Sequence, residues 1–171
     1  MKRIAKFEKV SFGQFEKDVQ KLWHNALDKT SIEEMYDNVE LPSRATKDSA
    51  GYDIKSPFRF SLKPGDTITI PTGLRVCMAN GWVLKCYPRS GQGFKYRARL
   101  NNTVGIIDGD FCYSENEGHI HLKISNENTE GKLLQIAEGQ GFAQGIFVEY
   151  GITYDDDAAG TRNGGFGSTD V

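Results

Sequence analysis

The sequence lacks a long hydrophobic run. No segment approaches the roughly 18 apolar residues of a membrane-spanning helix, and residues 2–8 lack the apolar stretch of a signal peptide. An excess of either charge is also missing, because 21 basic and 23 acidic residues leave a net charge of −2. A balance so near zero gives neither a polybasic patch for a membrane surface nor an electrostatic footprint for nucleic acid. We therefore expect a cytoplasmic protein with no membrane and no nucleic-acid partner.

The sequence has few of the residues that build metal centres. Its three cysteines, Cys77, Cys86 and Cys112, include no C-x-x-C pair and no histidine at a zinc-ligand spacing. We interpret them as free thiols in strands. His119 and His121 alternate along an expected strand and so share one face. Two histidines can hold a metal, but no third ligand near them completes a site, so a polar strand face is the simpler interpretation.

Glycine and aromatic residues are plentiful: 19 Gly, 10 Phe and 7 Tyr occur among 171 residues. This composition is typical of short strands joined by tight turns. Short runs rich in Val, Ile, Thr and Phe, separated by Pro and Gly, predict a mainly β fold, either a sandwich or a barrel-like roll. The strands that we expect are Thr67–Ile70, Leu74–Met78, Trp82–Tyr87, His119–Ile124 and Phe142–Val148.

The two ends of the chain differ from this β-rich middle. Apolar residues at helical intervals predict a helix over 12–27 and a second helical turn over 31–36. Residues 155–171 are too glycine-rich and polar to pack on their own, which predicts a mobile arm. We expect one domain over 1–171, with residues 11–38 as a short helical insertion.

Five short segments carry residue types that suit a nucleotide site. In chain order they are Ser49–Asp53, Pro88–Gly91, Asn102–Phe111, Phe142–Phe147 and Arg162–Ser168.

Two of these segments offer groups that suit an anion. Pro88–Gly91 ends an expected strand with a turn that exposes backbone N–H groups, a hydroxyl and a guanidinium, all of which suit phosphate oxygens. Arg162 and Phe166 stand on a glycine-rich tether, which suits a lid over an anionic ligand that contains a ring. A surface turn and a frayed tail are the alternatives.

The other three segments place single polar residues beside apolar ones. Asp108 follows two apolar residues at a strand end and can serve as a general base, and Phe111 can stack on a sugar. The alternative for this segment is a D-G-D hairpin turn. Asp53 can equally be a turn aspartate. Gln144 interrupts an apolar run, so it is either a structural bridge or a ligand contact.

In this order, the five segments resemble the five motifs of the trimeric dUTPase family, the dUTP nucleotidohydrolases, from about Leu41 to the end of the chain. The resemblance implies a β-rich, jelly-roll-like subunit of the dUTPase β-clip type. It also implies a homotrimer with active sites shared between subunits, and Mg²⁺ as the cofactor. The implied reaction is hydrolysis of dUTP to dUMP and pyrophosphate by water attack on the α-phosphate. That reaction keeps uracil out of DNA and supplies dUMP for dTMP synthesis.

The resemblance also implies roles for individual residues. Asp108 would be the catalytic base, and Asp53 would hold Mg²⁺ through water. Asn102 would help to line the uracil pocket, and Phe166 would stack on the base. The residues implied to contact the substrate are Arg89, Ser90, Gly91, Asn102, Gly105, Ile106, Ile107, Asp108, Phe111, His121, Gln144, Arg162, Phe166 and Gly167.

The sequence departs from the family pattern in three places. Phe111 stands where the family usually has tyrosine, which keeps the ring and removes a hydroxyl. Residues 112–117 form a longer connection than usual beside the uracil pocket. The last motif has one residue fewer between Arg162 and Phe166. Residues 11–38 are an addition to the minimal family, and the sequence identifies no partner for them.

Two alternative functions stay open. An enzyme like dCTP deaminase shares the Pro88–Gly91 turn, but it needs a carboxylate on the strand after the pocket, and residues 119–124 contain none. A dUTP-sensing or protein-binding module could keep the fold without the activity. The presence of Asp53, Arg89 and Asp108 argues against such a loss.

Overall fold

The computed structural model describes residues 2–160, and its regular structure is mainly β, as predicted. The strands are β1 (Ala5–Lys9), β2 (Ser43–Arg44), β3 (Tyr52–Lys55), β4 (Phe60–Leu62), β5 (Thr67–Pro71), β6 (Leu74–Met78), β7 (Trp82–Pro88), β8 (Ala98–Leu100), β9 (Gly105–Ile107), β10 (His121–Asn126), β11 (Leu134–Ile136) and β12 (Gly141–Glu149). The helices are α1 (Phe12–Leu22), α2 (Lys29–Asp37), α3 (Ser90–Tyr96) and the 3₁₀ helix η1 (Gly109–Tyr113).

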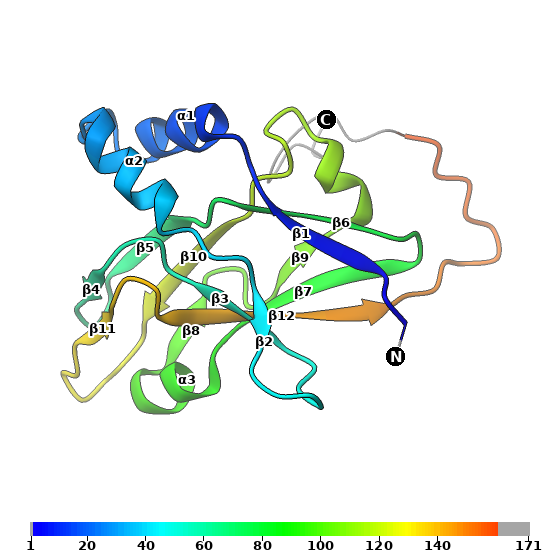
Figure 1. Cartoon of the computed structure of the whole chain (residues 1–171). Coiled ribbons are helices and arrows are strands. Elements are labelled where there is room, and N and C mark those ends of the chain that lie inside the picture. Colours follow the sequence, from blue (N-terminus) through cyan, green and yellow to red (C-terminus); the bar gives the residue numbers. More distant parts are fainter. Residues whose placement is uncertain (1, 161–171) are drawn as a thin grey trace.

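The largest sheet has the strand order β2-β3-β12-β7-β9, and its neighbouring strands are antiparallel. Its longest pairing joins β12 to β7, from Ala143 opposite Pro88 to Glu149 opposite Trp82. Three smaller sheets, β5-β10-β8, β1-β6 and β11-β4, complete the layers around it. Figure 1 shows α1 and α2 together on one side of these sheets and α3 away from them.

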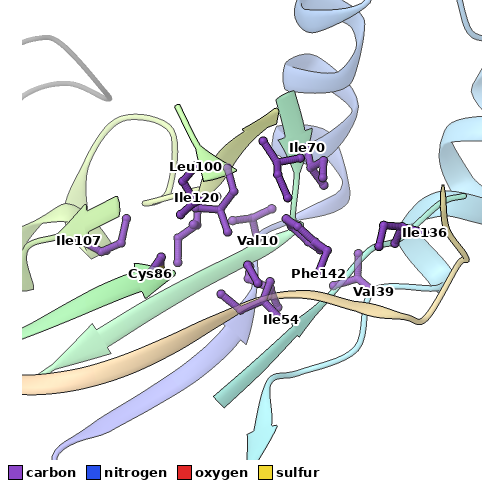
Figure 2. Packing of buried hydrophobic residues seen from close by; sticks show 14 of the residues in the cluster. Val10, Val39, Ile54, Ile70, Cys86, Leu100, Ile107, Ile120, Ile136 and Phe142 are labelled. Atoms are coloured by element: carbon purple, nitrogen blue, oxygen red, sulfur yellow. The ribbon is translucent and has the colours of Figure 1, made fainter. Parts of the chain in front are cut away.

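One cluster of buried side chains joins the sheets to the helical insertion. Phe142 on β12, Ile54 on β3 and Leu84 on β7 are completely buried, and so are Phe15 and Ile32 on α1 and α2. Figure 2 shows Phe142 and Ile54 within this packing. Truncating a buried phenylalanine such as Phe142 to alanine typically costs about 3–5 kcal/mol. The insertion is therefore part of the core and not an appendage.

The predicted helices form, but the first is shorter than expected. Ser11 caps α1, and its Oγ accepts a hydrogen bond from Gln14 N at 3.2 Å. The predicted helix over 12–27 ends at Leu22, because His24 and Asn25 take left-handed backbone angles, with φ of 51° and 58°. Such angles cannot continue a right-handed helix. The second helix begins after the Asp28 cap, earlier than the sequence indicated.

Two segments predicted as turns are helical. Pro88–Gly91 leads into α3, with Arg89 as its N-cap residue in extended conformation. The D-G-D sequence that follows β9 begins η1, with Asp108 at the cap position. The interpretation of each segment as a turn is therefore wrong. Each segment lies next to a strand end, and the short helix that starts there redirects the chain.

The interpretation of all three cysteines as free thiols is wrong. Cys77 on β6 and Cys112 in η1 form a disulfide. Only Cys86 among the described residues is a free cysteine, and burial raises its pKa to about 12. The disulfide ties the segment after β9 to the sheet β1-β6. No helix within residues 2–160 is long and apolar enough to cross a membrane.

Candidate active site

Three of the predicted site residues meet at one end of the three central strands of the largest sheet. Asp53 on β3 lies opposite Gln144 on β12, and Arg89 follows the end of β7. Arg89 Nε lies 3.2 Å from Asp53 Oδ1 in an ion pair. Gln144 Nε2 donates to Pro88 O at 3.4 Å. We call Asp53, Arg89, Ser90 and Gln144 the arginine cluster. Its charge and its hydrogen-bond donors suit a polyanionic ligand.

Two glycines keep this cluster open. A Cβ at Gly51 would lie 2.6 Å from Gln144 Oε1, and a Cβ at Gly141 would lie 2.8 Å from Arg89 Nη1. Real side chains essentially never approach so closely, so any larger residue at either position would move the amide or the guanidinium. Neither glycine was among the predicted site residues. Their positions were the signal in the sequence: Gly51 lies within the segment Ser49–Asp53, and Gly141 directly precedes the segment Phe142–Phe147.

The helix α3 presents the remaining groups of the cluster. Ser90 and Gly91 are exposed in its first turn, before the first intrahelical hydrogen bond from Gly93 N to Arg89 O. Their N–H groups therefore have no partner within the helix. Gln92 Nε2 donates to the carbonyl of Gly141 at 3.1 Å and fixes the start of α3 against β12. The sequence analysis did not single out Gln92.

The segment with the predicted base lies elsewhere on the same sheet. We call residues 102–111 the aspartate segment. Asn102 is exposed in the turn before β9, and Ile106 is 46 % exposed. Asp108 follows the end of β9 and is half-buried. Phe111 is only 3 % exposed, which argues against the broad sugar contact that the resemblance implies. That contact stays a prediction.

Within one chain, Asp108 of the aspartate segment lies far from the arginine cluster. Ile107 lies opposite Leu84 on β7, and Asp108 continues away from the end of β7 that carries Arg89. Five extended residues, the distance from Leu84 to Arg89, span about 16 Å. We call the arginine cluster and Asp108 the two half-sites, because they lie toward opposite ends of β7. A single copy of residues 2–160 does not bring its predicted base next to the residues predicted to bind phosphate.

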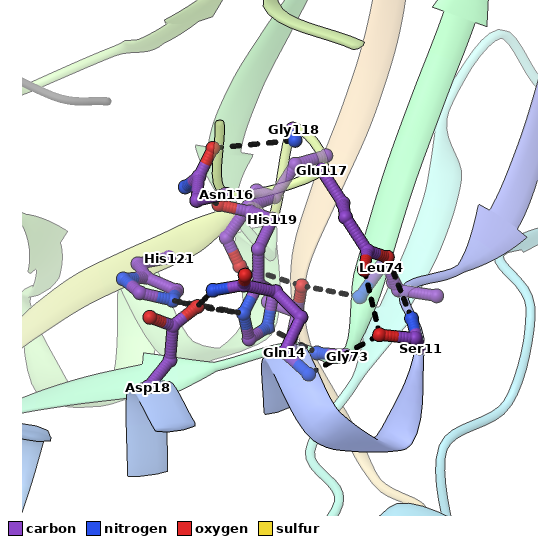
Figure 3. A network of polar contacts seen from close by, with 12 residues as sticks. Ser11, Gln14, Asp18, Gly73, Leu74, Asn116, Glu117, Gly118, His119 and His121 are labelled. Atoms are coloured by element: carbon purple, nitrogen blue, oxygen red, sulfur yellow. Dashed lines mark hydrogen bonds and ion pairs between the residues drawn. The ribbon is translucent and has the colours of Figure 1, made fainter. Parts of the chain in front are cut away.

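His121 belongs to a third group, which joins β10 to the helical insertion. Asp18 Oδ2 lies 2.7 Å from His119 Nδ1 and 3.4 Å from His121 Nε2, and Gln14 Nε2 donates to it at 2.8 Å. The expectation that no third ligand lies near the two histidines is therefore wrong (Figure 3). His119 is completely buried and is not part of a polar strand face. A role for His121 in the uracil pocket stays a prediction.

The hydrogen bonds of this group favour a proton network over a metal centre. Gly73 N donates to His119 Nε2 at 2.9 Å, so the neutral ring carries its proton on Nδ1 and donates it to Asp18. A nitrogen that carries a proton cannot ligate a metal. Burial lowers the pKa of His119 and outweighs its hydrogen bond to Asp18. Burial opposes the charge on Asp18, but three hydrogen bonds outweigh it and hold the pKa of that carboxyl far below its usual range.

The remaining predicted site residues, Arg162, Phe166 and Gly167, lie outside the described residues, as does most of the predicted arm. Residues 151–160 contain no helix or strand and are exposed.

Comparisons with known proteins identify the family of this chain. The family model described as dUTPase matches residues 37–170. The deoxyuridine 5'-triphosphate nucleotidohydrolase of Lactococcus lactis is 37 % identical over 134 residues, which are 77 % of this chain and 88 % of that protein. The protein of the same name from Escherichia coli K12 is 36 % identical over 135 residues, 74 % of this chain and 85 % of that protein.

Solved structures show the same fold. The crystal structure of a dUTPase from Streptococcus mutans has a TM-score of 0.62 and 29 % identity, and the match covers 86 % of this chain and 97 % of that one. A dUTPase from phage phi11 of S. aureus, described as showing a species-specific insert, has a TM-score of 0.62 at 19 % identity and shows the fold alone. Its match covers 92 % of this chain and 97 % of that one. The chain belongs to the dUTPase family.

Proposed function

We propose that this protein hydrolyses dUTP to dUMP and pyrophosphate, a reaction that keeps uracil out of DNA and supplies dUMP for dTMP synthesis. Membership of the dUTPase family supports the substrate. The observation that carries the proposal is the arginine cluster, where a carboxylate holds a guanidinium beside the first turn of α3. A triphosphate needs such an arrangement, because its charge requires a cation and several convergent donors.

In this proposal the arginine cluster binds the phosphate chain. The Arg89 fork, the Ser90 hydroxyl and the Gly91 N–H donate to phosphate oxygens, and Gln144 adds an amide. The single carboxylate of the cluster fits a Mg²⁺ site of the kind usual for nucleotides, since Mg²⁺ needs only one or two carboxylates besides phosphates and water. Asp53 is the carboxylate that would hold Mg²⁺ through water. When bound, Mg²⁺ would neutralise charge on the phosphate oxygens.

The aspartate segment supplies the base and the pocket for uracil. Asp108 accepts a proton from the water that attacks the α-phosphorus in line with the leaving pyrophosphate. A base positioned in this way typically contributes about 10²–10⁴-fold to the rate. Asn102 and the backbone of residues 105–107 line the uracil and deoxyribose pocket. A close-fitting backbone pocket beside β9 would leave little room for a 5-methyl group, which would favour uracil over thymine.

The two half-sites lead us to propose a homotrimer with shared active sites. The arginine cluster of one copy and the aspartate segment of the next copy would form each site, because one copy keeps Arg89 about 16 Å or more from Asp108 along β7. Cyclic symmetry repeats such a contact until the ring closes. Arg162 and Phe166 would complete each site as a lid.

Release of pyrophosphate from dUTP, dCTP, dTTP and UTP, measured under identical conditions, tests this function. We expect rapid release from dUTP and release at least about tenfold slower from the other three. Ammonia release from dCTP would favour a dCTP deaminase-like enzyme instead. Tight binding of dUTP without turnover would favour the dUTP-sensing module.

A further inference from the structure

The helical insertion contacts the connection that follows Asp108, and this contact gives the insertion a role. The connection, residues 108–119, contains η1 and residues 112–117, the stretch that the resemblance to the family implies to be longer than usual. Three backbone hydrogen bonds link its residues in steps of three. Phe111 N donates to Asp108 O at 3.2 Å, Ser114 N to Phe111 O at 3.1 Å, and Glu117 N to Ser114 O at 2.8 Å.

Glu117 joins the end of this series to the start of α1. Its carboxylate accepts hydrogen bonds from Ser11 N at 2.7 Å and from Ser11 Oγ at 2.6 Å (Figure 3). Hydrogen bonds to charged groups are among the stronger ones in proteins, and the carboxylate also lies at the positive end of a helix dipole. The two hydrogen bonds from Ser11 hold the pKa of Glu117 below its usual range.

The backbone at Glu117 shows that this position is held in place. Glu117 has a φ of 58°, in the left-handed region that favours glycine. A residue with a side chain pays about 1 kcal/mol or more there and stays only where its surroundings hold it. The next residue, Gly118, also has a positive φ, and a Cβ on it would lie 2.7 Å from Phe111 O and 2.8 Å from Cys112 Cα. Gly118 is therefore packed directly against η1.

A second contact holds the same connection at its far end. His119, which follows Gly118, donates from Nδ1 to Asp18 on α1 at 2.7 Å and accepts from Gly73 N at 2.9 Å. The insertion thus holds residue 117 from the N-cap of α1 and residue 119 from the middle of that helix. Between these contacts and β9, the connection contains the series of hydrogen bonds that begins at Asp108, and the disulfide of Cys112 ties it to β6.

We propose that Glu117 is a positioning residue for Asp108: by binding Ser11 at the start of α1, it fixes the 108–119 connection and thereby the placement of the base. This inference rests on the proposed function. It gives the helical insertion a role in maintaining the geometry of the active site. Stability alone does not require the contact, because α1 already buries Phe15 and Val19 in the core.

The test compares Glu117→Gly with Glu117→Gln and with Glu115→Ala. Glu117→Gly removes the carboxylate and adds no strain, since glycine accepts a φ of 58°. Glu117→Gln keeps one acceptor oxygen and should be intermediate. Glu115 is exposed in the same connection, so Glu115→Ala removes the same charge nearby and is the matched control. Each variant is measured as the full chain, for dUTP turnover and for amide hydrogen exchange of residues 108–113.

We expect Glu117→Gly to lower kcat about tenfold. The KM for dUTP should stay within about twofold, because the residues proposed to bind the phosphates lie outside the 108–119 connection. We also expect faster exchange of residues 108–113 and unchanged exchange of residues 89–96. Wild-type kcat and wild-type exchange in Glu117→Gly would overturn the proposal, as would a loss of thermal stability with unchanged kcat per folded site. If the wild type does not hydrolyse dUTP, the proposed function fails, and hydrogen exchange alone decides whether Glu117 fixes the connection.

Discussion

The ion pair between Asp53 and Arg89, with 3.2 Å between Oδ1 and Nε, joins β3 to the start of α3 across the end of β12. The Arg89 side chain is 41 % exposed and that of Asp53 is 25 % exposed. Exposed ion pairs contribute about 0–1 kcal/mol to stability. This ion pair therefore matters mainly because it orients the guanidinium of Arg89.

Asp53→Ala should separate these two effects. We expect the free energy of unfolding to fall by less than about 1 kcal/mol. The kcat/KM for dUTP should fall at least about tenfold, because Arg89 loses its orienting partner and Mg²⁺ its proposed carboxylate. Urea unfolding and steady-state kinetics measure the two quantities. Asp48→Ala, an exposed acid on the preceding loop, is the control and should change neither. An equal loss in both variants would contradict the assignment.

Gly141→Ala should displace the guanidinium of Arg89 without unfolding the protein. The new Cβ would lie 2.8 Å from Arg89 Nη1, the end of a flexible side chain that can move aside. We expect weaker dUTP binding, with KM raised about tenfold, and a melting temperature close to that of the wild type. Gly91→Ala introduces no such contact and is the control for stability. A melting temperature far below the wild type would show that Gly141 is required by the fold instead.

The disulfide between Cys77 and Cys112 should stabilise the folded chain. It closes a loop with a sequence separation of 35, and the loss of chain entropy in the unfolded state corresponds to about 3–4 kcal/mol. Urea unfolding at fixed protein concentration, with and without a dithiol reductant, measures the difference. Thiol titration of the denatured, unreduced protein should find Cys86 alone. Three reactive thiols before reduction would contradict the disulfide.

Acid should destabilise the protein through Asp18 and His119. The pKa of buried His119 is lowered, so the unfolded chain binds a proton that the folded chain does not, and stability falls as pH drops below about 6.5. The pKa of Asp18 is also lowered, so its contribution is lost as pH falls below about 4. Both effects have the same sign. The groups that face this pair are His121 and Glu117.

Melting temperatures between pH 8 and pH 5 test this dependence. His119→Gln should flatten the slope, because the group that titrates is gone. His24→Asn removes an exposed histidine and keeps a residue that tolerates left-handed angles, so it should leave the slope unchanged. An identical slope in His119→Gln and the wild type would assign the dependence to other groups.

The pattern of the sequence predicted the strands β5, β6, β7, β10 and β12, because short-range alternation determines them. β6 agrees residue for residue with the prediction, and β7 ends one residue later than predicted. The residues of the arginine cluster were named through the resemblance to the family, since three of the five segments contain them. The short helices α3 and η1 were not, because glycine-containing segments at strand ends are equally compatible with a turn.

Contacts between distant residues escaped the sequence analysis. The disulfide joins cysteines 35 residues apart, and Asp18 contacts a histidine 101 residues away. One signal for the second contact was present: Asp18 lies beside Phe15 and Val19 on the apolar face of α1. A charged residue on such a face needs a buried partner. The sequence alone could not say which residue that partner would be.

A mixture of two inactive variants should recover activity if the active sites are shared between subunits. Asp108→Asn keeps the shape of the side chain and removes the proton acceptor, so it should lower turnover at least about 10²-fold while dUTP still binds. Arg89→Ala should abolish phosphate binding. In a trimer in which each site takes the arginine cluster from one copy and the aspartate segment from another, random mixing gives about a quarter of the sites both intact halves.

The experiment unfolds and refolds the two variants together, and pyrophosphate release is compared with that of each variant refolded alone. We expect activity near a quarter of the wild type for the mixture and almost none for either variant alone. Recovered activity would require residues from two chains, because β7 separates Arg89 from Asp108 by about 16 Å or more within a copy. Each variant chain therefore keeps one intact half-site that only another chain can use. A mixture as inactive as its components would show that both halves act within one chain, and the shared site would be wrong.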